Sequence, residues 1–180
     1  MNFHQNIVVI IGPSGAGKTT LTETYIEQNP RWHLVRTYTT RPRRRPDESG
    51  HTFVTPAEAD KLRTDGSLIG DTEYHGYWYG LPQIPLDTNQ AIVLLRAMFV
   101  VPFLDVHPTA HIIQLEASLD TLMSRLKRRG EDDRMNPAAL SHEIDSGRSM
   151  SKTVISTEGE IGTVYKDFTA IMDSYGRSRN

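Results

Sequence analysis

Apolar residues along this chain fall into two patterns, short continuous runs and helical stripes, and the two patterns alternate. The runs at 7–11, 91–95 and 111–115 are typical of strands buried on both faces of a parallel sheet. The stripes over Lys18–Gln28 and 161–175 have the 3.6-residue spacing of helices packed on one face. This alternation predicts an α/β fold, a three-layer sandwich in which helices cover both faces of a mainly parallel sheet.

Capping residues mark several helix boundaries. Thr55, Pro56 and Glu58 match the cap, the first position and the third position of a helix. Similar signals predict helices that begin after Ser118 and after Asn136. The remaining segments predict strands at 33–38, Leu68–Tyr74, 77–80 and 154–155. The second and third of these flank a His-Gly turn, so we expect them to pair as an antiparallel hairpin.

Size, charge and composition restrict the class of protein. At 180 residues the chain is long enough for one domain that buries about 70% of its unfolded surface. The formal net charge of −2 indicates no nucleic acid and no membrane as partner. Cysteine is absent, which excludes disulfides, and no apolar run approaches the roughly 20 residues of a membrane span. We therefore expect a cytoplasmic protein, either a monomer or a homodimer.

The segment Gly12-Pro13-Ser14-Gly15-Ala16-Gly17-Lys18-Thr19 joins the first predicted strand to the first predicted helix. It fits the pattern G-x-x-x-x-G-K-[ST], in which glycines let successive N–H groups face phosphate oxygens. Lys18 would reach the β- and γ-phosphates, and the Thr19 hydroxyl would ligate Mg²⁺. A chance match in a Gly-rich turn is the alternative, and the position between strand and helix disfavours it. The segment, continued by Thr20, predicts a nucleoside triphosphate site.

A compact basic cluster follows the second predicted strand. Arg41, Arg43 and Arg44 surround Pro42, and arginine forks bind phosphate oxygens in pairs. Farther along, three aromatic residues at 77–79 occupy a tight segment between two glycines. The alternatives are a solvated basic turn and aromatic side chains that only fill a core. Together with the triphosphate site, the two segments suggest that a second phosphorylated molecule binds nearby.

Taken in order, these segments resemble the guanylate kinase family. The motifs are G-P-S-G-A-G-K-T-T, T-T-R-P-R-R, G-H-T-F, G-Y-W-Y-G and R-L-K-R-R-G, and the resemblance is continuous from about Ile7 to Gly130. It implies an ATP-dependent phosphotransferase that moves the γ-phosphoryl group of ATP, with Mg²⁺, to the phosphate of a small acceptor. It also implies a single domain over 1–180, with a core at about 1–38 and 83–180, a substrate-binding excursion at about 39–82 and a lid at about 125–142.

The resemblance also assigns residues to the acceptor. The family's phosphate-binding residues fall on Arg41, on either Arg43 or Arg44, and on Tyr79. His51 stands where the family usually has another phosphate-contacting tyrosine. These residues are expected to bind the acceptor phosphate while the loop at 12–20 binds ATP.

Four catalytic residues follow from the same resemblance. Lys18 would neutralise charge on the transferring group, and Arg125 and Arg129, joined by Arg134, would close over it from the lid. An arginine at the transferring phosphoryl group contributes about 10³-fold or more to the rate. The alternative for the lid arginines is a basic helix terminus that complements the helix dipole.

Three positions depart from the family's guanine-reading pattern. The acidic residue that reads guanine is replaced by Gly70, with Asp71 next to it as a possible substitute. Leu81 replaces a Ser or Thr, and Arg96 follows the strand that should end in aspartates. The sequence therefore predicts a nucleoside monophosphate as acceptor without predicting GMP.

Two alternative functions stay open. Ribose 1,5-bisphosphate phosphokinases resemble guanylate kinases, lack the guanine-reading acid, and carry a Tyr-x-Thr-Arg segment followed by a histidine. Tyr38-Thr39-Thr40-Arg41 and His51 are similar to that pattern, which would make phosphoribosyl diphosphate the product. The second alternative is an inactive guanylate kinase-like binding module, which the complete Gly-Lys-Thr sequence of the loop disfavours.

Overall fold

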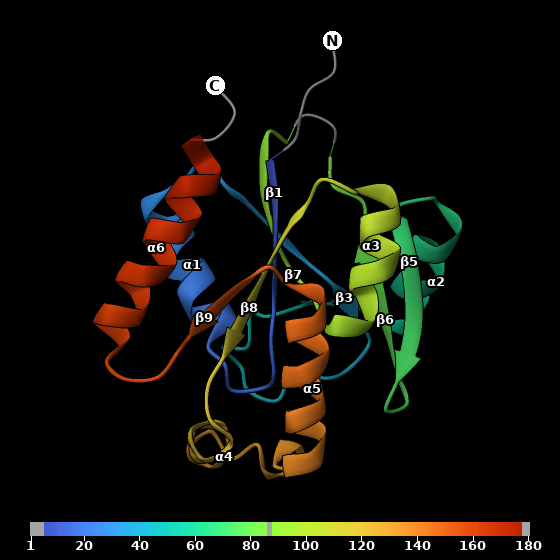
Figure 1. The fold of residues 1–180 in the computed structure, drawn as a ribbon. Coiled ribbons are helices and arrows are strands. Elements are labelled where there is room, and N and C mark those ends of the chain that lie inside the picture. Colours follow the sequence, from blue (N-terminus) through green and yellow to red (C-terminus); the bar gives the residue numbers. More distant parts are fainter. Residues whose placement is uncertain (1–5, 86–87, 178–180) are drawn as a thin grey trace.

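The computed structural model of the protein describes residues 6–85 and 88–177. Its central sheet has five parallel strands in the order β2-β7-β1-β8-β9 (Figure 1). The strands are β1 Asn6–Ile11, β2 His33–Arg36, β7 Gln90–Leu94, β8 His111–Glu116 and β9 Thr153–Ser156. The predicted parallel sheet is confirmed, and apart from 33–38 its strands end within one residue of the predicted positions.

Six α-helices accompany the sheets within the described residues. They are α1 Lys18–Gln28, α2 Pro56–Thr64, α3 Val100–Val106, α4 Leu119–Arg128, α5 Pro137–Met150 and α6 Ile161–Arg177. The predicted caps are confirmed: Thr55 and Glu58 form a reciprocal capping box, and Ser118 and Asn136 each accept a hydrogen bond from the first turn of the helix that follows. No helix in this part of the chain combines the length and the apolar character needed to cross a bilayer.

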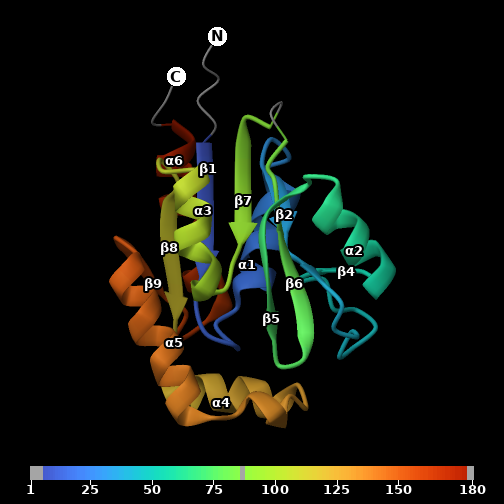
Figure 2. The same cartoon turned by 90° about the vertical axis from the view of Figure 1, so that its right-hand side faces the viewer.

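The alternation of side chains along β1 divides the interior into two cores. Val8 and Ile10 face α1, α4, α5 and α6, whereas Ile7, Val9 and Ile11 face α3 and the second sheet. Figure 2 shows α4 lying across the carboxyl ends of β1, β7 and β8. Because these strands are parallel, the loops that follow them gather at this end of the sheet.

The second sheet has the order β4-β3-β6-β5 and is mostly antiparallel. Its strands are β3 Tyr38–Thr39, β4 Thr52–Phe53, β5 Leu68–Tyr74 and β6 Tyr77–Pro82. The predicted hairpin of β5 and β6 is confirmed. The predicted strand at 33–38 is divided instead, because the carbonyl of Thr37 accepts the Thr52 N–H at 2.9 Å and the chain passes from one sheet to the other there.

Two elements had no counterpart in the sequence prediction, the helix α3 and the strand β4. The helix contains Pro102 in its first turn, where the missing N–H has no intrahelical partner to lose. Its residues are apolar on several sides, since Val100 and Phe103 are buried and Val101 is exposed, so no stripe marks it as a helix. β4 is only two residues long, too short for an alternation pattern.

One close contact fixes the distance between α5 and the central sheet. Gln114 of β8 is fully buried and donates from Nε2 to the carbonyl of Ile144 at 2.9 Å. Directly beside it, a Cβ atom on Gly147 would lie 1.8 Å from Gln114 Oε1. A larger residue at position 147 would therefore require either this buried amide or the helix to shift.

Candidate active site

A cavity of about 650 Å³ opens at the carboxyl ends of β1 and β7. The first wall is the loop between β1 and α1, with residues 12 and 14–20. The second wall belongs to the β3–β6 sheet and its loops and includes Arg41, Arg44, His51 and Tyr79. Arg129 and Arg134 contribute from the segment after α4. The structure thus brings most of the predicted site residues around one space.

Glycines give the loop at 12–19 its shape. Gly12, Gly15 and Gly17 have φ values of 143°, 85° and 86°, in the region that disfavours side chains. A Cβ atom on Gly12 would also lie 2.1 Å from the carbonyl oxygen of Leu115. Gly17 caps α1 with no side-chain hydrogen bond, so the first-turn N–H groups stay available to an anion.

Lys18 is folded back onto this loop. Its Nζ donates to the carbonyls of Gly12 at 2.6 Å and Pro13 at 2.9 Å. Burial lowers the pKa of Lys18 to about 7, the Glu143 carboxylate opposes that shift, and Arg134 adds to it. A bound polyphosphate would favour the charged ammonium, so phosphate binding and protonation of Lys18 should be linked.

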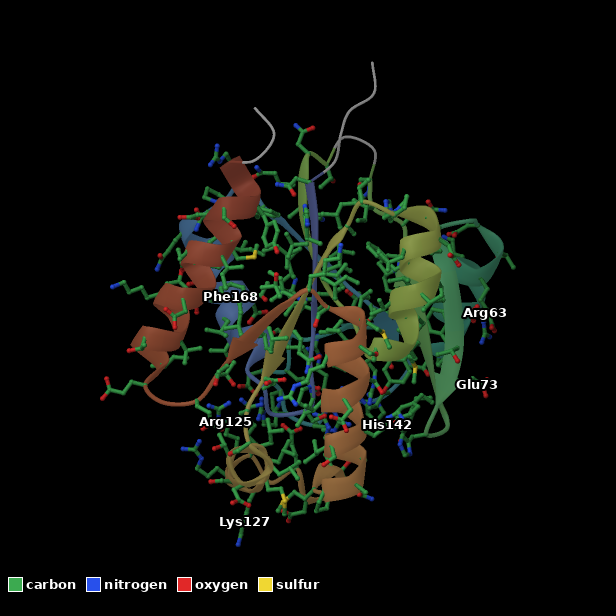
Figure 3. All side chains as sticks on the ribbon, in the orientation of Figure 1. Arg63, Glu73, Arg125, Lys127, His142 and Phe168 are labelled. Atoms are coloured by element: carbon green, nitrogen blue, oxygen red, sulfur yellow. The ribbon has the colours of Figure 1, made fainter. Side chains whose placement is uncertain are left out.

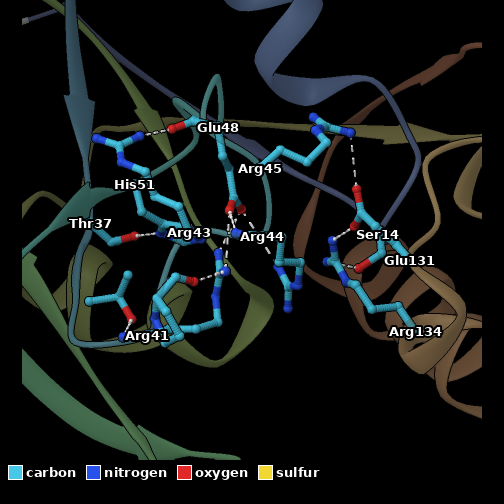
Figure 4. Close-up of polar contacts among 12 residues, drawn as sticks. Ser14, Thr37, Arg41, Arg43, Arg44, Arg45, Glu48, His51, Glu131 and Arg134 are labelled. Carbon is cyan, nitrogen blue, oxygen red and sulfur yellow. Dashed lines mark hydrogen bonds and ion pairs between the residues drawn. The ribbon is translucent and has the colours of Figure 1, made fainter.

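The second wall, which is the predicted acceptor wall, is built on Arg41. Its side chain is only 6% exposed and donates to Glu48 Oε1 at 2.6 Å and to Glu48 Oε2 at 3.2 Å (Figure 4). Arg44 also binds Glu48, through its backbone N–H at 2.7 Å. Among the described residues Arg41 Nε has no hydrogen-bond partner although it is buried. A buried, unpaired guanidinium donor in a cavity wall is suited to an anionic ligand.

His51 lies beside this arginine as a neutral group. Its Nδ1 is 2.8 Å from Thr37 Oγ1, and its ring packs edge-on against Tyr79 with centroids 5.7 Å apart. Burial, and next the charge of Arg41, lower the pKa of His51 to about 4. At neutral pH this side chain offers a hydrogen bond and no charge.

Two residues predicted to bind the acceptor lie outside the cavity wall. Asp71 accepts from Arg63 Nε at 2.8 Å and from Trp78 Nε1 at 2.5 Å. It pairs with Gly80, one residue from Tyr79, and because successive side chains point to opposite faces it turns away from the cavity. Arg43 stacks on the Phe53 ring at 4.3 Å and donates to the Glu48 carbonyl. Of the two arginines predicted as alternatives for the acceptor phosphate, the geometry therefore favours Arg44, which lines the cavity.

The lid arginines separate into two groups. Arg134 donates to Ser14 Oγ and, at 2.7 Å, to Glu131, and it lines the cavity with Arg129. Arg125 points from α4 toward the body of the protein, whereas Lys127 points away from it (Figure 3). The hydrogen-bond partners of Arg125 differ from those of Arg134. Arg125 donates to the Gly15 carbonyl at 3.2 Å and to the Thr157 carbonyl at 2.5 Å. In this structure Arg125 supports the loop from behind.

A second cavity, of about 440 Å³, lies on the other side of the loop. Its wall combines the glycines at 15 and 17, the stems of Arg125, Arg128 and Arg129, and apolar side chains such as Ile161. Sequence reasoning missed it, although Gly159, with φ 88° just before α6, marks the turn that forms one edge. The mixture of flat cations and apolar groups suits an aromatic ring system.

Sequence reasoning also missed two carboxylates that contact the site, Glu48 and Glu143. Glu48 neutralises Arg41, and Glu143 contacts the loop at Ser14. Burial alone would raise the pKa of Glu48, but hydrogen bonds from Arg41 and from the Arg44 backbone lower it. The only sequence signal for Glu48 is a single acid after a run of arginines, and Glu143 has no comparable signal.

The comparisons with known proteins agree with this geometry. The family model described as Guanylate kinase matches residues 4–175. The chain belongs to the guanylate kinase family. A guanylate kinase of Nitrosomonas europaea is 31% identical, with 93% of this chain and 89% of the relative covered. A guanylate kinase of Synechocystis sp. is also 31% identical and covers 70% of each chain.

The fold has a counterpart among solved structures of the same family. The crystal structure of guanylate kinase from Anaplasma phagocytophilum aligns with a TM-score of 0.67 and 20% sequence identity, covering 96% of this chain and 87% of that one. At this identity the likeness establishes the fold. Family membership also makes this protein a phosphotransferase of the nucleotide monophosphate kinase type.

Proposed function

We propose that the protein transfers the γ-phosphoryl group of ATP to the phosphate of a small acceptor, a nucleoside monophosphate. One observation carries the proposal: Lys18 with its amide-lined loop lies in one wall of the cavity, and Arg41, whose buried Nε has no hydrogen-bond partner among the described residues, lies in the other. Two anion sites across one space are what in-line transfer between two phosphates requires.

On the donor side, the loop amides and Lys18 would hold the triphosphate. The base of ATP would enter the second cavity, between the arginine stems and Ile161. Thr19 lies on the cavity wall at the start of α1, and its hydroxyl is the hard oxygen ligand that Mg²⁺ takes together with phosphate oxygens and water. When bound, Mg²⁺ would neutralise charge on the β- and γ-phosphates.

On the acceptor side, Arg41, Arg44 and Tyr79 would orient the acceptor phosphate. One of its oxygens attacks the γ-phosphorus, the bond between that phosphorus and the bridging oxygen breaks, and ADP leaves. The nucleophile is already an anion, so no general base is assigned. Arg129 and Arg134 would neutralise the charge that spreads over the transferring group.

Two kinds of evidence bear on the identity of the acceptor: the names of the relatives and the side chains of the acceptor wall. The curated relatives are named guanylate kinase, which makes GMP the first acceptor to test. Gly70 provides no side chain to read a base. Arg96 lines the cavity and stacks on the Tyr74 ring at 4.3 Å. Arg96, added to Arg41 and Arg44, favours ribose 1,5-bisphosphate, which has two phosphates, as the second candidate.

A coupled assay of ADP release tests both candidates. With ATP and Mg²⁺, the panel is GMP, dGMP, AMP, CMP, UMP, dTMP and ribose 1,5-bisphosphate. We expect turnover with at least one acceptor, reduced about 10²–10³-fold by Lys18→Ala and unchanged by Lys152→Ala, which removes an exposed ammonium outside both cavities. No turnover with any acceptor would favour the inactive binding module.

A further inference from the structure

Glu143 contacts both ends of the active-site cavity at once. One carboxylate oxygen accepts the backbone N–H of Ser14 at 3.1 Å, within the phosphate-binding loop. The other accepts from Arg96 Nη2 at 3.2 Å, at the end of β7. Both side chains are about three-quarters buried. The Glu143 carboxylate thus accepts a hydrogen bond from the Ser14 amide, one of the loop amides that would otherwise bind a phosphate oxygen.

Three further observations show that this contact is built into the fold. Glu143 raises the pKa of Lys18 against the effect of burial, so the two groups sense each other's charge. The helix that carries Glu143 is held against β8 by the hydrogen bond from Gln114 Nε2 to the Ile144 carbonyl, beside Gly147. Arg96, its partner, also stacks on Tyr74 in the acceptor wall.

We propose that Glu143 is an internal anion that occupies the phosphate loop in the empty enzyme and is displaced when the donor nucleotide binds. Its displacement releases Arg96, which then completes the acceptor wall. Glu143 is therefore a positioning residue: it makes acceptor binding depend on prior binding of the donor. This inference rests on the proposed function, because it needs a polyphosphate in the loop.

The experiment measures donor affinity by calorimetry with ADP, tripolyphosphate and adenosine as probes, each with and without Mg²⁺. Glu143→Gln keeps the shape and the hydrogen-bond acceptor but removes the charge. We expect ADP and tripolyphosphate to bind about fivefold or more tightly to this variant, and adenosine to bind unchanged. Asp145→Asn makes the same charge change at an exposed position of the same helix and should leave all three affinities unchanged.

A second measurement tests the coupling to the acceptor. In the unaltered protein a saturating non-hydrolysable ATP analogue should tighten the binding of GMP and of ribose 1,5-bisphosphate, whichever binds, by about fivefold. In Glu143→Gln the analogue should have little effect, because the ion pair that holds Arg96 is already absent. Thermal unfolding of both variants shows whether either change acts through stability alone.

Several outcomes would overturn the inference. Equal ADP affinity in Glu143→Gln and the unaltered protein would show that the carboxylate does not compete with phosphate. Weaker ADP binding only in the presence of Mg²⁺ would make Glu143 a group that organises the metal instead. Absence of ADP binding to the unaltered protein would reject the proposed function as well, whereas binding without the shift rejects this inference alone.

Discussion

We expect the two ends of the cavity to bind anions by different means. The donor end is a main-chain site, shaped by glycines at positive φ and held from behind by Arg125. The acceptor end is a side-chain site, in which Arg41 and Arg44 converge on Glu48. A main-chain site depends on a few glycines, whereas a side-chain site can be altered residue by residue. The comparison explains why the loop keeps the whole motif while Gly70 and Leu81 depart from the family pattern.

The largest effect should come from the glycine with the least room. In Gly12→Ala the new Cβ would meet the Leu115 carbonyl at 2.1 Å, so we expect a loss of about 3 kcal/mol or more in the free energy of unfolding. Gly17 also has a positive φ, 86°, but no atom lies within 4 Å of the new Cβ, and Gly17→Ala should lose about 1 kcal/mol. Urea unfolding of both variants measures the two losses in the free energy of unfolding. Equal losses would show that the close approach to the Leu115 carbonyl is not the cause.

At the acceptor end, Arg41→Ala should raise the KM for the acceptor about 10- to 100-fold, because a buried charge-assisted hydrogen bond is lost. The KM for ATP should change less than about threefold, since the donor site is a separate main-chain site. Arg63→Ala removes an arginine with two carboxylate partners on the outer side of the same sheet and serves as the control. Steady-state kinetics that showed equal changes in both KM values would place Arg41 outside the acceptor site.

The next effect concerns the pH dependence of stability, to which His51 at the acceptor end should contribute. Because His51 has a pKa of about 4 in the folded protein and about 6.5 when unfolded, the unfolded state takes up the proton first as the pH falls. Stability is therefore lost between pH 6.5 and 4, and at pH 5 the loss from this residue should be about 1–2 kcal/mol. His51→Gln should remove that part of the pH dependence, while the exposed His33→Gln should leave it unchanged. Urea unfolding at pH 7 and pH 5 provides the test.

The smallest effect should follow removal of the support behind the loop. Arg125→Ala deletes hydrogen bonds to the Gly15 and Thr157 carbonyls, and we expect about 1 kcal/mol less stability and a modestly higher KM for ATP. Lys127→Ala, on the outward side of α4, is the control. A fall of 10³-fold in kcat for Arg125→Ala would instead make Arg125 a residue that acts on the transferring group.

Local signals in the sequence predicted the frame of the molecule well. The strand β1, the helix α1 and the capping box at Thr55 depend on neighbouring residues only, and each matches the structure. The break at Thr37 could not be predicted, because it depends on a hydrogen bond to Thr52 in a segment far along the chain. The helix α3 was missed because its apolar residues form no stripe.

The site was predicted unevenly for a similar reason. The donor loop is contiguous in the sequence, so its motif describes it nearly completely. The acceptor wall draws on distant segments, and the choice between Arg43 and Arg44 depends on which guanidinium the Phe53 ring captures. The position of Glu143 depends on how α5 packs, which no residue near it in the sequence reveals.

Gly147 lines the active-site cavity, and its lack of a side chain leaves room for the buried amide of Gln114 between α5 and the sheet. A methyl group added at that position would meet the end of the Gln114 side chain, so either that amide or the helix, with the carboxylate it carries one turn earlier, would have to shift. Under the proposed role of Glu143, we expect a substitution at position 147 to change nucleotide affinity through the packing of α5, one helical turn away from the carboxylate.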